Sequence, residues 1–250
     1  MSRFAIIGYP VRHSLSPAIF RAAYPNTEDR YDFIEAATIA EAMEIFRNGG
    51  YTGANITAPF KQEILQYCTH IDNTALRASA TNLIKECNGE LYAYNSDYTG
   101  VQSLAEKLIA NNIVTKRGIV SGAGGAGRAA ALALADLGFE VTILNRTLER
   151  AEKFAINHSL SYGDLENISQ FLSPNSLLIH TTDHELPNQK ELNFSEIVVI
   201  EANYKKSNLS DTICKRYISG TEWLISQAVP AFKLLTGFKP DLDAIKKIVK

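Results

Sequence analysis

The chain has 250 residues, of which 46% are hydrophobic and 21% are charged, a composition typical of a globular protein with room for one or two domains. Its net charge of −2 and its pI near 6.2 argue against a nucleic-acid or anionic-membrane partner. The three cysteines are scattered, which fits free thiols in the cytoplasm, and no apolar run is long enough for a signal peptide or a membrane span.

The first hundred residues alternate between strand and helix patterns. Strands and helices are predicted in turn over residues 3–7, 18–24, 31–34, 39–47, 51–57 and 60–67. Ser16 is expected to cap the first helix, with Pro17 at its first position. The pair Asn88-Gly89 then favours a hairpin, formed by strands over residues 81–85 and 90–94. A long helix is expected from Asp97 to Asn111.

The glycine-rich stretch after residue 117 has the clearest pattern. It lies between a predicted strand (118–121) and a predicted helix (128–137), and a second strand follows over residues 140–144. In such a unit, glycines permit a tight turn, let the backbone approach a pyrophosphate, and allow close helix–strand packing. The N–H groups at the helix start then hold the phosphates. We therefore predict a dinucleotide site, rather than an ordinary strand–helix turn, at Gly122, Ala123, Gly124, Gly125, Ala126 and Gly127.

The residues after the second strand indicate which dinucleotide binds. Enzymes that use NAD usually place Asp or Glu there, where it accepts hydrogen bonds from the ribose 2′-hydroxyl. This chain instead has Asn145-Arg146-Thr147, with Arg150 in the following helix. A guanidinium can hold a 2′-phosphate through two charge-assisted hydrogen bonds. The pattern favours NADP, although two surface arginines at a helix start would look the same.

The later elements extend this dinucleotide-binding unit. A helix to residue 157, strands over 176–180 and 197–201, and helices over 223–235 and 240–250 are expected. The order predicts an α/β fold with two domains. The first is an α/β domain over residues 1–99, completed by helices within residues 226–250. The second, over residues 100–225, is a Rossmann-type domain with a doubly wound parallel sheet.

Polar residues gather where the predicted strands of the first domain meet helices, a usual place for sites in α/β folds. Ser14 and Ser16 could bind a small carboxylate at a helix start, although loop and N-cap roles are simpler. Lys61 is predicted in the first turn of its helix, where the dipole disfavours an ammonium and thereby suits proton transfer. A surface lysine is the commoner explanation. Asp97 could orient Lys61 or be an ordinary first-turn acid.

Two further features lack a clear chemical role in the sequence alone. Gln227 interrupts an apolar helix, and such residues are usually satisfied polar groups of the core. His180 and His184 are the one close pair among five histidines, and they lie on a predicted loop without metal-site spacing. No metal is therefore expected.

The order of these motifs resembles that of the shikimate dehydrogenase family. Similar segments run through nearly the whole chain: Gly8–Pro17, Asn55–Lys61, Ala78–Asn82, Asn95–Gly100, the glycine-rich turn, Asn145–Thr147 and Gly220–Ala228. Several motifs in the right order are far more specific than any one of them.

The resemblance implies an NADP-dependent oxidoreductase that reversibly reduces 3-dehydroshikimate to shikimate, a step of chorismate and aromatic amino-acid biosynthesis. Lys61 and Asp97 would be catalytic, with Lys61 shuttling the proton at the reacting oxygen. The substrate carboxylate would be bound by Ser14, Ser16 and Tyr204. The ring hydroxyls would meet Lys61, Asn82, Asp97 and Gln227, with Thr57 beside them. The cofactor would also contact Thr182 and Gly220.

The chain departs from the family pattern at several positions. The run from His180 to Glu185 replaces Asn-x-Thr-Ser and a nearby glycine, Glu201 replaces an aspartate, and Leu83 replaces a threonine. Pro230 must occupy a first helical turn or cause a kink. Two alternatives stay open: a quinate or quinate/shikimate dehydrogenase, and a catalytically weak NADP-binding regulator. The expected protein is a cytoplasmic monomer or homodimer that binds neither nucleic acid nor membranes.

Overall fold

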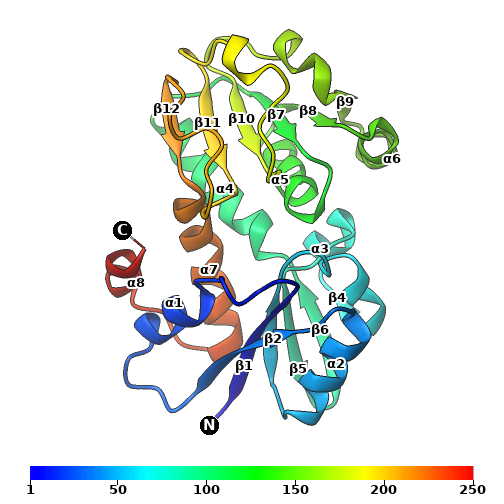
Figure 1. Cartoon of the computed structure of the whole chain (residues 1–250), viewed down its shortest axis with the longest axis vertical. Helices are drawn as coiled ribbons and strands as arrows, with labels where there is room; N and C mark the ends of the chain where they lie inside the picture. The colour runs from blue at the N-terminus through cyan, green and yellow to red at the C-terminus, as the bar shows by residue number, and fades with distance from the viewer. Residues whose placement is uncertain (250) are drawn as a thin grey trace. The chain divides into compact units, whose positions relative to one another are not determined.

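Residues 1–249 are described by a computed structural model (Figure 1). They form two compact units, one made of residues 1–96 and 227–249 and the other of residues 97–226. The chain passes between the units within helices α4 (Ser96–Ala110) and α7 (Gly220–Thr236). The predicted domain boundaries fall inside the same two helices. The roles predicted for the domains, substrate binding and NADP binding, stay predictions at this point.

The first unit is built on a six-stranded sheet with the order β2-β1-β3-β5-β6-β4. Its strands are β1 (Arg3–Gly8), β2 (Arg30–Glu35), β3 (Gly53–Ile56), β4 (His70–Ile71), β5 (Leu83–Cys87) and β6 (Glu90–Tyr94). Its helices are α1 (Ser16–Ala23), α2 (Ile39–Asn48), α3 (Asn73–Ala78) and α8 (Leu242–Ile248). Strand β1 is parallel to β2 and β3, whereas β3, β5 and β6 are antiparallel neighbours. The carboxyl ends of β1 and β3 therefore meet at one edge of the sheet.

Local sequence signals explain two of these elements. The hairpin of β5 and β6 turns at Asn88 and Gly89, whose φ angles of 55° and 83° are both positive, as a type I′ turn requires. This confirms the predicted hairpin. Helix α2 begins with a capping box, in which Thr38 and Glu41 each bond the other's backbone N–H.

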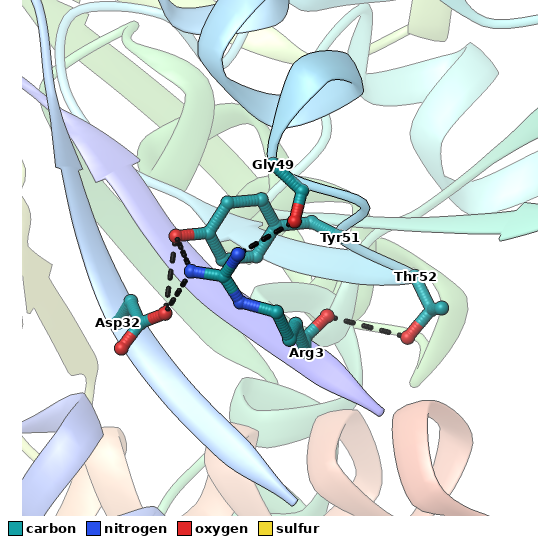
Figure 2. A network of polar contacts seen from close by, with 5 residues as sticks. All are labelled: Arg3, Asp32, Gly49, Tyr51 and Thr52. Carbon is teal, nitrogen blue, oxygen red and sulfur yellow. Dashed lines mark hydrogen bonds and ion pairs between the residues drawn. The ribbon is translucent and has the colours of Figure 1, made fainter. Parts of the chain in front are cut away.

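A polar network around Arg3 joins β1, β2 and the loop before β3 (Figure 2). The guanidinium donates to the Gly49 carbonyl at 2.7 Å and to the Tyr51 hydroxyl at 3.0 Å, and it pairs with the Asp32 carboxylate at 2.9 Å. Arg3 opens β1, so this network lies at the amino-terminal edge of the strand. The network holds the sheet together at this edge. The other end of β1 is the one that leads to Ser14.

The helix starts in the first unit differ from the prediction. Helix α1 begins at Ser16 itself, with Leu15 as its N-cap, so the prediction that Ser16 caps the helix is wrong. The Ser14 hydroxyl instead accepts a hydrogen bond from the Ser16 N–H at 3.2 Å. The Ser14 hydroxyl thus accepts from the first backbone N–H of the helix, which has no partner within the helix. Ser16 itself lies in the first turn.

The prediction of a helix over residues 60–67 is also wrong. A turn leads into a short 3₁₀ helix, Glu63–Tyr67, in which the N–H groups of Leu65 and Cys68 bond carbonyls three residues back. This tighter winding is typical of short connectors. Lys61 therefore lies in the turn before the 3₁₀ helix, and the dipole argument made for it does not apply.

The second unit has six parallel strands in the order β12-β11-β10-β7-β8-β9. They are β7 (Arg117–Ser121), β8 (Glu140–Asn145), β9 (Ser161–Asp164), β10 (Leu177–His180), β11 (Val198–Glu201) and β12 (Arg216–Ile218). Read from the β9 edge, the strands run third, second, first, fourth, fifth, sixth, which is the Rossmann order and confirms the predicted fold. Ligands bind such sheets at the carboxyl ends where the order reverses, here between β7 and β10.

Most of the strands and helices that were not predicted from the sequence are short. Strands β4, β9 and β12 have 2, 4 and 3 residues, and α3 has 6, too few to show a hydrophobic period.

Helix α7 carries Pro230 in its interior, so the option of a first-turn proline is wrong. Within residues 1–249, every helix falls short of the length and apolar character needed to cross a membrane, and no metal-binding cluster of three or more His, Cys, Asp or Glu side chains occurs.

Candidate functional site

The glycine-rich turn connects β7 to helix α5 (Gly125–Asp136). Gly122 has a φ of +105°, and a Cβ there would lie 2.5 Å from the Thr181 hydroxyl oxygen. At Gly124, by contrast, a Cβ would meet nothing within 4 Å. The turn therefore needs a glycine at position 122 for its own conformation, whereas Gly124 leaves open space in front of the helix start.

A pocket of about 500 Å³ lies at this turn, at the reversal point of the sheet. Its predicted members are Gly122, Ala123, Gly124, Asn145, Arg146, Thr147, Arg150 and Thr182. Its lining also includes Thr181, His184 and Glu185, from the run 180–185 that departs from the family pattern, and four residues that the sequence did not single out: Leu165, Glu166, Pro187 and Asn188. These come from the start of the 3₁₀ helix Leu165–Gln170 after β9 and from the loop after β10, which a nucleotide motif does not cover. Gly125, Ala126, Gly127 and Gly220 do not line the pocket.

Asn145 joins the two turns that form the pocket. Its side-chain oxygen accepts from the Ala123 N–H at 3.0 Å, and its side-chain nitrogen donates to the Thr147 carbonyl at 2.8 Å. Because an aspartate could make only the first of these bonds, the amide suits this position. Asn145 thus fixes the glycine-rich turn relative to the start of helix α6 (Leu148–His158).

Positive charge gathers on one side of the pocket. Arg146 and Arg150 are both exposed and line it. The side chain of Arg128, on α5, donates to the Ala123 carbonyl at 3.0 Å and lies over the Phe154 ring. Burial, and secondly the repulsion of Arg150, lowers the pKa of Arg128. The two exposed guanidinium groups remain available for an anion such as a phosphate.

Gly220 allows two backbone segments of the second unit to lie close together. A Cβ at this position would lie 2.5 Å from the carbonyl carbon of Asn203 and 2.6 Å from the Tyr204 nitrogen. Gly220 therefore lets the start of α7 pack against the backbone that carries Tyr204. It supports that loop, and the cofactor contact expected for Gly220 stays a prediction.

In the first unit, three polar side chains form a triangle. The Asn82 amide nitrogen donates to the Ser96 hydroxyl at 2.9 Å and to the Gln227 side-chain oxygen at 3.2 Å, and the Ser96 hydroxyl lies 3.0 Å from that same oxygen. Asn82 is buried and Gln227 half-buried. Since these bonds use the oxygen of Gln227, its amide nitrogen is the donor left for a ligand hydroxyl. The sequence predicted Asn82 and Gln227 but not Ser96 as part of this group.

The ends of β1 and β3 bring a second set of predicted residues together. Thr57 follows β3, and its N–H donates to the Ile7 carbonyl of β1. A Cβ at Gly8 would lie 2.4 Å from the Thr57 methyl group, so the glycine allows this close approach. The carbonyl of Lys61 accepts from the Thr81 N–H at 2.7 Å, which links the lysine turn to the segment that carries Asn82.

Ser14 and Ser16 lie at the start of α1, with their hydroxyl oxygens 3.2 Å apart. Ser16 is buried and Ser14 is half-buried. Asp97, in the first turn of α4, is buried, and Tyr204 is half-buried. These last two residues belong to the second compact unit, so a common site for all the predicted substrate residues stays a prediction.

Comparisons with known proteins agree with this division. Residues 6–84 match a family model described as the shikimate dehydrogenase substrate binding domain, and residues 103–208 match one described as shikimate / quinate 5-dehydrogenase. The chain is 30% identical to the shikimate dehydrogenase (NADP(+)) of Aquifex aeolicus, with 99% of this chain and 96% of the relative covered. It is 32% identical to the protein of that name from Methanococcus aeolicus, with 98% and 95% covered.

Solved structures give the same result. The shikimate 5-dehydrogenase of Thermus thermophilus, in complex with NADP(H) and shikimate, is 30% identical, with a TM-score of 0.83 over 100% of this chain and 98% of that one. A quinate dehydrogenase from Corynebacterium glutamicum in complex with NAD has a TM-score of 0.82 over 98% of this chain and 97% of that one, but only 22% identity. The second likeness shows the fold alone.

Proposed function

The chain belongs to the shikimate dehydrogenase family, and we propose that it uses NADP(H) to interconvert 3-dehydroshikimate and shikimate. The first unit, together with the helices that complete it, binds the substrate, and the second unit binds the cofactor. The observation that carries the cofactor assignment is the pocket that unites Gly124, Arg146 and Arg150 at the reversal point of the sheet.

The residues of this pocket fit NADP. The open space at Gly124 admits a pyrophosphate next to the N–H groups at the start of α5. Arg146 and Arg150 would hold the 2′-phosphate, with Asn145 and Thr147 shaping the turn between them. Thr182, and with it the loop after β10, would border the rest of the dinucleotide. When bound, NADPH would supply the hydride for reduction of the ketone, and NADP⁺ would accept a hydride in the reverse direction.

The substrate side is assigned residue by residue from the family resemblance. The hydroxyls of Ser14, Ser16 and Tyr204 bind the carboxylate, which needs donors and no acceptors. Asn82 and Gln227, already held in place by Ser96, hydrogen-bond the ring hydroxyls. Their mutual bonds fix both amides before the substrate arrives, which reduces the entropy lost on binding.

Lys61 and Asp97 carry the proton chemistry. Lys61 donates a proton to the oxygen on C3 when the ketone is reduced and takes it back in the reverse direction. Asp97 orients the Lys61 ammonium. Thr57 lies on the segment that leads to Lys61 and contributes to the same wall of the substrate site.

Initial rates with shikimate or quinate, each paired with NADP or NAD, test this proposal. We expect shikimate with NADP to give the highest kcat/KM. A preference for quinate or NAD would favour the quinate dehydrogenase alternative. The absence of turnover with all four pairs, despite NADP binding, would support a regulator instead.

We infer further that the enzyme works in the cytoplasm, where its three free cysteines stay reduced. It acts as a monomer or a homodimer. Sedimentation velocity at micromolar concentration distinguishes these two states, and a larger assembly would contradict both.

A further inference from the structure

We propose that His180 is a positioning residue for cofactor binding, held as a neutral imidazole with its hydrogen on Nε2. In this role it fixes the segment 181–188, which forms one wall of the nucleotide pocket. The inference rests on the proposed NADP site.

His180 occupies the centre of a buried polar row at the carboxyl edge of the parallel sheet. It is the last residue of β10, and its register neighbours are Ser121 on β7 and Glu201 on β11. All three residues are fully buried. Each one directly precedes a loop: the glycine-rich turn, the segment 181–188, and the loop that carries Tyr204. A buried polar row at the origin of three loops can set their relative positions.

The hydrogen bonds of His180 define its tautomer. Nε2 lies 3.0 Å from the carbonyl oxygen of His184 and 3.5 Å from the side-chain nitrogen of Asn208. The shorter contact decides the assignment: a carbonyl can only accept, so Nε2 carries the hydrogen. Nδ1 lies 2.7 Å from the Ser121 hydroxyl, which then donates to the unprotonated Nδ1. The imidazole thus uses one nitrogen as donor to the loop and the other as acceptor from β7.

The His184 carbonyl is the point at which the middle of the loop is joined to His180. It also accepts from the Thr182 hydroxyl at 3.2 Å, while the Thr181 hydroxyl donates to the Ser121 carbonyl at 2.8 Å. Thr181, Thr182 and His184 all line the nucleotide pocket. Losing the donor on His180 would therefore release the middle of this wall while its first residue stays attached to β7.

The groups around His180 are consistent with a neutral ring. Burial lowers its pKa, and this effect is opposed by the negative charge of Glu201 on β11, by the hydrogen bond to the His184 carbonyl and by the charge of Asp183 in the loop. Tyr217 of β12 donates to Glu201 at 2.6 Å, and the backbone N–H of Asn208 donates to it at 2.6 Å. The Glu201 carboxylate is thus already stabilised by its own hydrogen-bond donors and does not require an imidazolium.

Three variants separate positioning from packing. Gln places an amide donor near the position of Nε2, Asn places its amide near that of Nδ1, and Leu fills the space without any polar group. We expect His180→Leu to raise the Kd for NADPH about tenfold, the factor expected for one lost hydrogen bond in the pocket wall. His180→Gln should stay within about threefold of wild type, and His180→Asn should lie between the two.

The control is His158→Leu, which removes a half-buried histidine from α6 in the same unit, packed against Phe154. It should leave the Kd for NADPH unchanged. The KM for shikimate should be the same in all variants, since the substrate residues are not altered. Equal Kd values for His180→Leu and wild type, or equal losses in His180→Leu and His180→Gln, would overturn the proposal.

Two measurements keep the test independent of folding and of the overall function. Long-range ¹H–¹⁵N NMR correlations on the wild-type protein should show the Nε2–H tautomer of His180 at neutral pH, and an imidazolium or an Nδ1–H tautomer would overturn the assignment. NADPH binding is measured without substrate. A wild-type protein that binds NADPH but does not oxidise shikimate would therefore overturn the proposed function, while the order of the three variants would still decide the role of His180.

Discussion

A Cβ atom on Gly127 would stand 1.8 Å from the carbonyl oxygen of Gly122. The first turn of α5 can approach the end of β7 only because Gly127 has no side chain. Gly124, two residues from Gly122, has no neighbour within 4 Å of the place where a Cβ would stand. Two glycines of one turn therefore serve different purposes: one allows backbone to pack on backbone, and the other leaves space for a ligand.

We expect Gly127→Ala to lower the free energy of unfolding by about 2–3 kcal/mol, because the helix start must move away from the strand. Gly124→Ala is the matched control. Its φ of −79° suits alanine, so its stability should change by less than about 0.5 kcal/mol, while NADPH binding weakens. Urea unfolding and NADPH titration measure the two effects. A Gly127→Ala protein as stable as wild type would refute the packing argument.

Arg146→Ala tests the choice of cofactor. Loss of a charge-assisted hydrogen bond to the 2′-phosphate should raise the KM for NADP by about 10- to 100-fold. The KM for NAD, which lacks that phosphate, should change little. Arg117→Ala, at the start of β7 and exposed, should behave as wild type with both cofactors. An equal rise for NAD and NADP would assign Arg146 to the shape of the pocket and not to phosphate recognition.

The Rossmann half of the fold could be predicted because its signals are local and sequential. Gly122, Gly124 and Gly127 lie within one turn, and the flanking strands are long enough to show their apolar character. The residues Leu165, Glu166 and Pro187 could not be found this way. They reach the pocket from segments after two other strands, and only the pairing order of the sheet brings them to the same edge.

The Ser96 contact shows the same limit in the first unit. Asn82 and Gln227 are 145 residues apart in sequence, and motif order alone suggested that both serve the substrate. Their direct bond, and the place of Ser96 between them, depends on where α7 enters the unit. Likewise the turn at Lys61 could not be told from a helix, because proline followed by an apolar run is typical of both.

The protonation of His180 predicts a dependence of stability on pH. Its folded-state pKa is lowered by burial, so the unfolded chain binds a proton at this position more readily than the folded one. The contribution of His180 is therefore fully present above about pH 6.5, the unfolded value. It falls by about 1.4 kcal/mol per pH unit as the pH drops from there toward the folded pKa.

The difference in unfolding free energy between wild type and His180→Gln, measured in urea at several pH values, isolates this effect. Glutamine does not titrate, so the difference should be constant above pH 7 and should change below about pH 6.5 in favour of the variant. His158→Gln, at a half-buried histidine of α6, provides the comparison. A difference that is flat from pH 8 to pH 5 would mean that His180 titrates alike in both states.

Gln227→Leu tests the polar triangle. It removes the amide proposed to meet a substrate hydroxyl, so the KM for shikimate should rise about tenfold, with little change in the Kd for NADPH. Asn82 and Ser96 keep their bond to each other, which should limit the loss of stability to about 1 kcal/mol. Gln66→Leu, exposed in the same unit, is the control. An unchanged KM for shikimate would leave Gln227 with a structural role only.

Lys61→Ala tests the proton transfer itself. Removal of a general acid–base group typically lowers kcat by about 10²- to 10⁴-fold, and we expect a loss in this range for both directions of the reaction. The Kd for NADPH should not change, because Lys61 belongs to the first unit and the nucleotide pocket is lined only by residues of the second. Lys107→Ala, exposed on α4, should retain the wild-type kcat. A kcat for Lys61→Ala equal to that of the control would remove Lys61 from the chemical step, and the proton would then have to reach the C3 oxygen from another donor.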